Sequence, residues 1–133
     1  MNKEIRFKQR FENFQRSYQL LSHAVDNKQT SDIERAGLIQ FFEMTFELSW
    51  KTLKDYLESQ GFDLKTPKEI FKQAFQTGII KDGHAWMEAL EDRNLMTHTY
   101  NEQMSLKVVG LIKEKYYPCI KQLYEYLSVK ATL

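Results

Sequence analysis

The spacing of the apolar residues near the N-terminus is the feature that most constrains the fold of this chain. These residues recur in steps of four, three, four, three and four, at Phe7, Phe11, Phe14, Tyr18, Leu21 and Val25. An α-helix has 3.6 residues per turn, so residues at these steps share one face. The spacing predicts a long amphipathic helix that ends near Asn27.

Start and stop signals predict two further helices in the first part of the chain. The second helix begins around Ser31 or Asp32, either of which is a good N-cap, and Gly61 is placed as its C-terminal stop. The segment TPKE, residues 66–69, combines an N-cap threonine, a proline at the first helical position and a glutamate two residues later. This combination predicts a short helix over Pro67–Gln76.

The same signals continue to the C-terminus. A helix is predicted from about Asp82 into the segment EDRNLMTHTY, residues 91–100. The segment TYNE, residues 99–102, has the spacing of a capping box, so a last helix is predicted from about Asn101 to Ser128. Pro118 is expected to kink that helix, because proline removes a backbone donor and clashes one turn back.

Three long helices and two short ones predict an all-α fold, an up-and-down antiparallel bundle of the four-helix-bundle type. The 133 residues are 42% hydrophobic and 14% aromatic, which is enough apolar material for a core. No convincing strand alternation, repeat or linker interrupts the pattern. We therefore expect a single helical domain over residues 1–133.

Composition and missing motifs exclude several classes of function. A formal net charge of +1 does not suit bulk electrostatic binding of nucleic acid, so RNA or a nucleotide would bind locally and DNA binding is not predicted. There is no glycine-rich phosphate loop, HExxH or CxxC, and Cys119 has no partner cysteine. No metal or cofactor site is predicted. Without a signal peptide or an apolar run of membrane length, we expect a cytoplasmic protein.

The segment EDRNLMTHTY places an arginine where an apolar residue is due. Arg93 falls on the stripe that includes Trp86, Leu90 and Thr97, at steps of four, three and four. None of the residues one turn away from Arg93 is acidic, and an inward-facing guanidinium without a partner is costly. It requires water in a cleft, an anionic ligand or a carboxylate from another helix. Glu43 or Glu47 could supply that carboxylate, whereas Trp86 itself is interpreted as core.

A histidine that follows Arg93 suggests phosphate chemistry. His98 lies five residues on, so the two side chains are about 140° apart on a regular helix. They converge if the chain turns at Thr99, or if a symmetric dimer brings Arg93 of one chain to His98 of the other. Asn94 shares a face with His98 and could orient its ring. Arginine binds phosphate and histidine transfers protons, a pairing that suits metal-free RNA cleavage. The structural alternative is a helix-capping arginine, a histidine on the helix dipole and a packed Tyr100.

The motif and its flanks resemble a known family. RNLMTH matches the Arg–four–His signature of HEPN domains, and with Tyr100 it becomes Arg–x4–His–x–Tyr, which resembles the toxin subunits of HEPN/MNT toxin–antitoxin pairs. LIQFFEMTFELSWKTLKDYLESQG and TPKEIFKQAFQTGIIKDGHAWMEALEDRNLMTHTY are similar to nucleotidyltransferase substrate-binding proteins. The resemblance covers roughly residues 5 to 127.

The resemblance implies a homodimeric helical bundle that is a metal-independent endoribonuclease. Arg93 would stabilise the scissile phosphate, His98 would transfer protons, and Asn94 would support them. Glu47 is kept as a second supporting residue because it could supply the carboxylate that Arg93 lacks on its own helix. A separate minimal nucleotidyltransferase, the MNT antitoxin, would neutralise the toxin by adding AMP to Tyr100. The alternative is a non-catalytic subunit that binds the substrate nucleotide for the nucleotidyltransferase. A third possibility is a helical scaffold that only docks its neighbour.

Overall fold

The computed structural model describes residues 2–96 and 101–133, with side chains throughout these ranges except at positions 94 and 95. These residues form α-helices and one π-helical turn, and they contain no strand. The elements in chain order are α1 (Lys3–Asp26), α2 (Asp32–Ser59), α3 (Pro67–Gln76), α4 (Gly83–Met96), α5 (Glu102–Leu111), η1 (Ile112–Tyr116) and α6 (Tyr117–Ala131). The predicted all-α class is confirmed.

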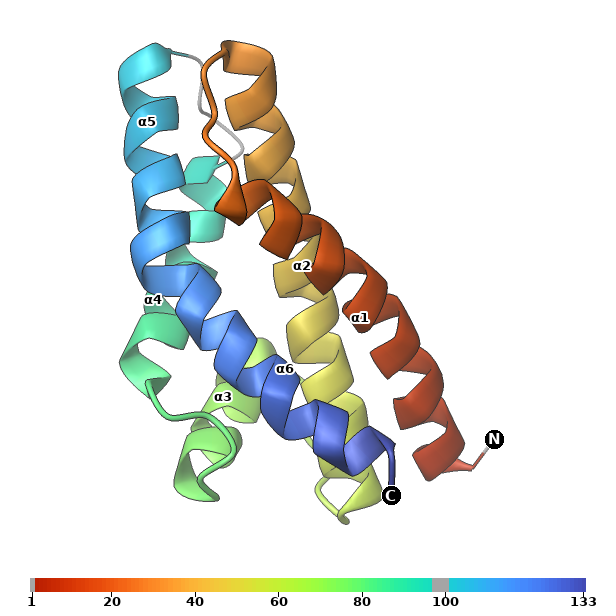
Figure 1. Cartoon of the computed structure of the whole chain (residues 1–133). Helices are drawn as coiled ribbons and strands as arrows, with labels where there is room; N and C mark the ends of the chain where they lie inside the picture. The colour runs from red at the N-terminus through yellow and green to blue at the C-terminus, as the bar shows by residue number, and fades with distance from the viewer. Residues whose placement is uncertain (1, 97–100) are drawn as a thin grey trace.

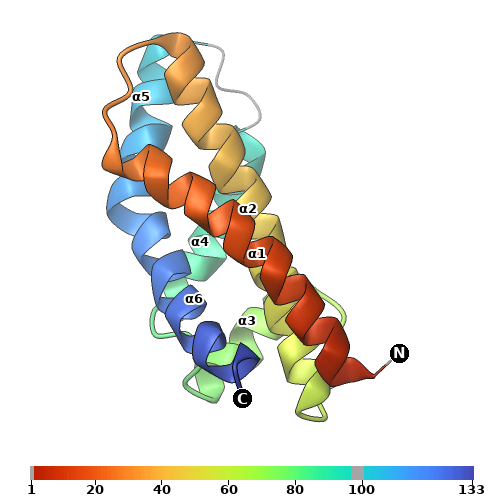
Figure 2. The ribbon, with the colours of Figure 1, turned by 45° about the vertical axis from the view of Figure 1, so that its right-hand side comes forward.

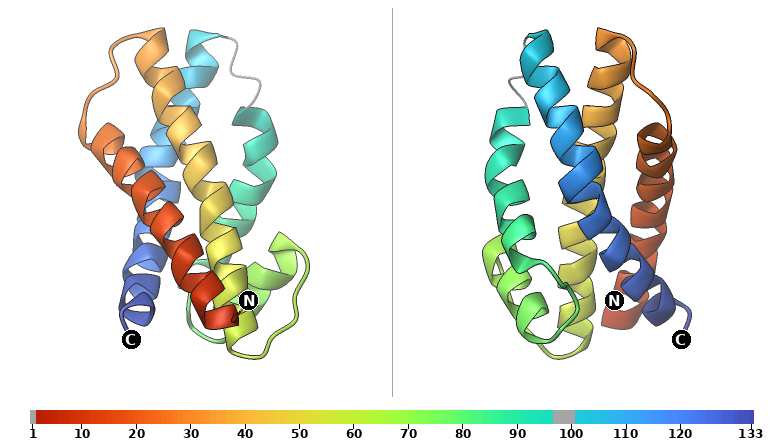
Figure 3. Two further views of the ribbon diagram at one scale, coloured as in Figure 1. Left: turned by 90° about the vertical axis from the view of Figure 1, so that its right-hand side faces the viewer. Right: turned by 60° about the vertical axis from the view of Figure 1, so that its left-hand side comes forward.

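The long helices alternate in direction, as an up-and-down bundle requires (Figure 1). α1 crosses α2 diagonally (Figure 2), and α2 also packs against α5 and α6. α4 contacts α3 and the π turn, and both termini lie at the same end of the bundle (Figure 3). Lys8 Nζ reaches the carbonyl of Leu133 there at 2.9 Å. The Lys8 hydrogen bond thus joins the two ends of the chain. The contacts with α3 and the π turn hold α4 against the rest of the bundle.

Side chains near the helix starts satisfy backbone donors that have no partner within the helix. Ser31 caps α2 by accepting from the backbone N–H of Glu34, and Thr66 and Glu69 form the predicted capping box of α3. At α5 the cap is Asn101, whose side chain accepts from the N–H of Met104 at 2.8 Å. Asn101 is thus the described cap of α5, and the capping box predicted in TYNE needs Thr99, which lies outside the described residues.

The last predicted helix is α5, η1 and α6 joined end to end. Pro118 is the second residue of α6, which follows the π turn, and the helix changes direction in this region (Figures 1 and 3). A π turn accommodates an extra residue, which relieves the clash of the proline ring with the preceding turn. The helix ends at Ala131 rather than Ser128, because no glycine or proline follows Ser128 to stop it.

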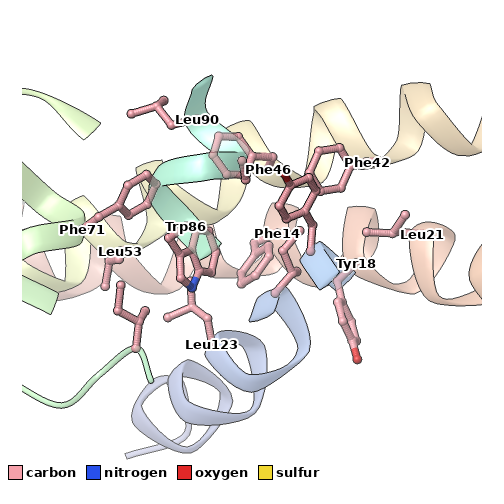
Figure 4. Packing of buried hydrophobic residues seen from close by; sticks show 14 of the residues in the cluster. Phe14, Tyr18, Leu21, Phe42, Phe46, Leu53, Phe71, Trp86, Leu90 and Leu123 are labelled. Carbon is pink, nitrogen blue, oxygen red and sulfur yellow. The ribbon is translucent and has the colours of Figure 1, made fainter. Parts of the chain in front are cut away.

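The core is rich in aromatic rings (Figure 4). Phe46 on α2 stacks on Trp86 of α4, with ring centroids 5.8 Å apart, and Phe71 of α3 lies 5.1 Å from the same indole. Trp86 is 1% exposed, so its interpretation as core is correct. These contacts anchor the first half of α4 against α2 and α3. Within the described residues, no helix combines the length and apolar character needed to cross a membrane.

Candidate functional site

Arg93 on α4 pairs with Glu47 on α2. Its Nη1 donates to Glu47 Oε1 at 2.9 Å, and the side chains are 40% and 42% exposed. The arginine therefore has a carboxylate from another helix and also faces solvent. This is one of the two carboxylates that the sequence offered for Arg93. A guanidinium has five N–H donors, so the contact with Glu47 leaves capacity for a phosphate oxygen.

The other oxygen of Glu47 is also engaged by its own helix. Trp50 Nε1 donates to Glu47 Oε2 at 3.1 Å, and Lys51 Nζ lies 4.0 Å from the same atom. Because these contacts come from the next turn of α2, they fix the direction of the carboxylate toward α4. Trp50 is partly buried rather than a core residue, since its indole reaches this polar site.

Glu43 lies one turn before Glu47 on α2, and it does not pair with Arg93. Burial raises the pKa of its carboxyl above the ordinary value. Within residues 2–96 and 101–133 it forms no ion pair. The choice between the two glutamates therefore depends on how α2 and α4 are aligned, which the spacing within each helix does not determine.

A second contact holds the residue next to Arg93. The hydroxyl of Tyr116, in the π turn, donates to Asp92 Oδ2. Tyr116 is 2% exposed and stacks on Phe42 at 5.8 Å. Burial, followed by this hydrogen bond, raises the pKa of the Tyr116 hydroxyl, so it stays protonated as a donor. Positions 92 and 93 are thus held from two different helices.

The sequence did not reveal the contact between Asp92 and Tyr116. The two residues are 24 positions apart. No helical spacing links residues on different helices, so only the packing of η1 on α4 brings them together. The nearest signal was the position of Tyr116 two residues before Pro118, where a distortion of the helix was expected.

The other predicted site residues lie outside what the structure describes. His98, Tyr100 and the proposed turn at Thr99 fall between the described ranges, and the side chain of Asn94 is not described. The convergence of His98 with Arg93, within one chain or across a dimer, therefore stays a prediction. Among the described residues, no group of three or more His, Cys, Asp or Glu side chains is arranged to hold a metal ion.

The fold and the site together define the class of protein: an all-α bundle with a half-exposed, carboxylate-held arginine near the end of a helix. Residues 9–129 match the family model described as "Nucleotidyltransferase substrate binding protein like". The chain belongs to this HEPN/nucleotidyltransferase substrate-binding family.

The proteins that are similar to the chain include a curated relative and a solved structure. The Probable ribonuclease HepT of Haemophilus influenzae is 31% identical over 84 residues, which span 59% of this chain and 58% of that protein. A crystal structure of a protein from Thermus thermophilus has 28% identity and a TM-score of 0.74, and the match covers 90% of this chain and 99% of that one. The chain thus has the fold of the Thermus protein over almost its whole length.

Proposed function

We propose that this chain is a metal-independent endoribonuclease toxin whose activity depends on Arg93 and His98. The observation that carries the proposal is the pairing of Arg93 with Glu47, which holds a guanidinium half-exposed at the motif. Similarity to a probable ribonuclease supports the same reading over the matched part of the chain. A fixed, permanently charged arginine suits the recognition and stabilisation of a phosphate.

The proposed reaction needs no metal because the nucleophile belongs to the RNA. The 2′-hydroxyl oxygen attacks the adjacent phosphorus and loses its proton to a base, while the bond from phosphorus to the 5′-oxygen breaks. The leaving oxygen takes up a proton, which gives a 2′,3′-cyclic phosphate and a 5′-hydroxyl end. His98 transfers protons in this scheme, and Arg93 stabilises the charge on the phosphate oxygens.

The proposed active form is a homodimer with the two motifs at a shared cleft. His98 lies five positions after Arg93, so on one regular helix the two side chains diverge by about 140°. A two-fold axis places the arginine of each chain beside the histidine of its partner without distorting either helix. Asn94, one turn before His98, supports the ring in this arrangement.

The proposed regulation is the transfer of AMP from ATP to Tyr100 by a separate minimal nucleotidyltransferase. The tyrosine oxygen attacks the α-phosphorus of ATP, pyrophosphate leaves, and the phenolic proton passes to a base or to solvent. Tyr100 follows His98 by two residues. A phosphodiester there adds negative charge and bulk where the RNA phosphate would bind, which opposes cleavage.

A second candidate function is a non-catalytic subunit that presents a nucleotide to the partner enzyme. The description of the matched family favours it. A half-exposed Arg93 would hold a nucleotide phosphate in the same way as an RNA phosphate. The two functions differ in the need for His98, because proton transfer is required for cleavage but not for binding.

The test compares wild-type protein with Arg93→Ala and His98→Ala, first on labelled RNA in EDTA and then with ATP in a binding assay. The proposal predicts RNA cleavage by the wild type and loss of cleavage in both variants, with unchanged helical circular dichroism. Absence of cleavage, together with ATP binding that is lost in Arg93→Ala and kept in His98→Ala, would contradict it and support the binding subunit. Intact mass first establishes that Tyr100 is unmodified.

A further inference from the structure

A groove runs between α3 and the start of α4, away from the site around Arg93. Its volume is about 480 Å³, and α3 supplies one wall while Gly83, His84 and Met87 supply the other. Gly83 and Arg93 are ten positions apart, which corresponds to about 15 Å along the axis of α4. The two short segments lie side by side at the end of the bundle that carries the termini (Figure 3). The groove is therefore a separate feature of the surface.

The floor of the groove is apolar. Phe71 is buried beneath it, Met87 is half-buried, and Phe75 is 54% exposed within it. A Cβ atom at Gly83 would lie 3.0 to 3.3 Å from the side chain of Phe75, so the glycine lets Phe75 pack closely against the start of α4. The exposed ring shares one groove with Phe71 and Met87, which distinguishes it from a scattered surface hydrophobe.

The rim of the groove is positively charged. Lys68 and Lys72 are exposed, one turn apart on α3, and neither forms an ion pair with any residue that the structure describes. The neighbouring carboxylates already have partners. Glu69 caps α3, Asp82 accepts from the N–H of Ala85 at 3.0 Å, and Glu88 is bound by His84 and Lys115. The two lysines are thus the charges available to an incoming group.

We propose that this groove docks an acidic amphipathic helix of a partner protein. Apolar side chains at helical spacing would cover Phe75 and Met87, and carboxylates beside them would pair with Lys68 and Lys72. The charge complementarity selects an acidic partner over a basic one. An apolar floor without hydrogen-bonding groups fits aliphatic side chains better than the edges of a nucleotide base.

The first experiment selects binders from a random library of 12-residue peptides displayed on phage, with immobilised wild-type protein. A Lys68→Glu/Lys72→Glu variant serves for counter-selection. The proposal predicts enriched peptides with leucine-like residues at spacings of three and four and with flanking Asp or Glu. Enriched peptides that are basic, or that bind the double variant equally well, would overturn it.

The second experiment measures the affinity of an enriched peptide by fluorescence anisotropy. The proposal predicts at least tenfold weaker binding to Lys68→Glu/Lys72→Glu and to Phe75→Ser, and weaker binding at high salt. The matched control is Lys107→Glu/Lys121→Glu, which makes the same change in net charge at exposed positions on α5 and α6 and should bind as the wild type does. Equal loss in the control would contradict a localised site.

A labelled single-stranded oligodeoxynucleotide, which lacks the 2′-hydroxyl needed for cleavage, serves as the competing probe. Binding of this oligonucleotide that depends on Lys68, Lys72 and Phe75, without enrichment of acidic peptides, would overturn the proposal in favour of a nucleic-acid platform. Melting temperatures of all variants are compared with the wild type, since each substituted side chain is exposed and should leave the fold intact.

Discussion

Arg93 and Glu47, 46 residues apart in the sequence, form an ion pair of 2.9 Å that connects α4 to α2. Asp92, the preceding residue, is held by Tyr116 from the π turn. The end of α4 is therefore fixed on two sides before it reaches the segment that carries His98. Catalytic groups must be held within a fraction of an ångström, so these contacts position the proposed site.

Glu47→Gln should reduce RNA cleavage much more than it reduces stability. The amide keeps the shape of the carboxylate but loses its charge, so Arg93 is no longer held in one direction. We expect kcat/KM to fall by about ten- to a hundredfold, while the free energy of unfolding changes by no more than about 1 kcal/mol because the pair is half-exposed. Cleavage kinetics and urea denaturation measure the two quantities.

Glu12→Gln, exposed on α1, is the control. Unchanged cleavage by Glu47→Gln would show that the carboxylate does not position Arg93.

Tyr116→Phe should destabilise the protein and lower its activity together. The phenylalanine keeps the stacking on Phe42 but removes the donor to Asp92, and a hydrogen bond to a charged group contributes about 1.5–3 kcal/mol. Tyr124→Phe is the matched control, because the Tyr124 hydroxyl accepts a neutral bond from Gln15 at 2.8 Å. Urea denaturation should show the larger loss for Tyr116→Phe. Equal losses in the free energy of unfolding, with full cleavage activity in both variants, would show that the bond from Tyr116 to Asp92 does not position the site.

Two glycines should respond to alanine in opposite ways. Gly37 lies inside α2, and a Cβ there would meet nothing within 4 Å. Gly37→Ala should stabilise the protein by roughly 0.5–1 kcal/mol. Gly61, after α2, has φ +97°, which strains any residue with a Cβ. Gly61→Ala should lower the free energy of unfolding by about 1–2 kcal/mol. Chemical denaturation followed by circular dichroism measures both changes, and the same sign for both would contradict the backbone described for these positions.

The protein should lose stability as the pH rises above about 10, the ordinary pKa of tyrosine. Burial raises the pKa of Tyr56 to about 12, and it also raises the pKa values of Tyr18 and Tyr116. At a pH between 10 and the raised pKa values, these tyrosines have lost their protons in the unfolded chain but keep them in the folded chain. Unfolding therefore becomes more favourable as the pH increases. Tyrosinate absorbance should therefore finish rising only as helical circular dichroism is lost. Complete ionisation with helicity intact would contradict the burial of these hydroxyls.

A mixture of two inactive variants should regain activity if the proposed site is shared across a dimer. Arg93→Ala and His98→Ala chains, refolded together, form mixed dimers in which one of the two sites keeps both groups. Random pairing predicts about one quarter of wild-type activity. Each variant refolded alone is the control. Mixed dimers without activity would place Arg93 and His98 of each site in the same chain.

The helices could be predicted from the sequence because their information is local. The steps of three and four in α1 and the capping box at Thr66 and Glu69 require only neighbouring residues. The sequence left water, an anionic ligand or a carboxylate as the partner of Arg93, with Glu43 or Glu47 as the candidate carboxylates, and choosing between the two glutamates requires the alignment of α2 with α4. The contact between Tyr116 and Asp92 depends wholly on packing between helices. The roles of His98, Tyr100 and Asn94 remain predictions from the motif.

The most direct test of the central claim is the identity of the ends that the purified protein leaves on RNA in EDTA, measured by mass spectrometry beside His98→Ala. Attack by the 2′-hydroxyl of the RNA predicts 2′,3′-cyclic phosphate and 5′-hydroxyl ends with the wild type, and intact RNA with His98→Ala. Intact RNA in both samples with Tyr100 unmodified, or ends with a 5′-phosphate, would contradict cleavage by Arg93 and His98.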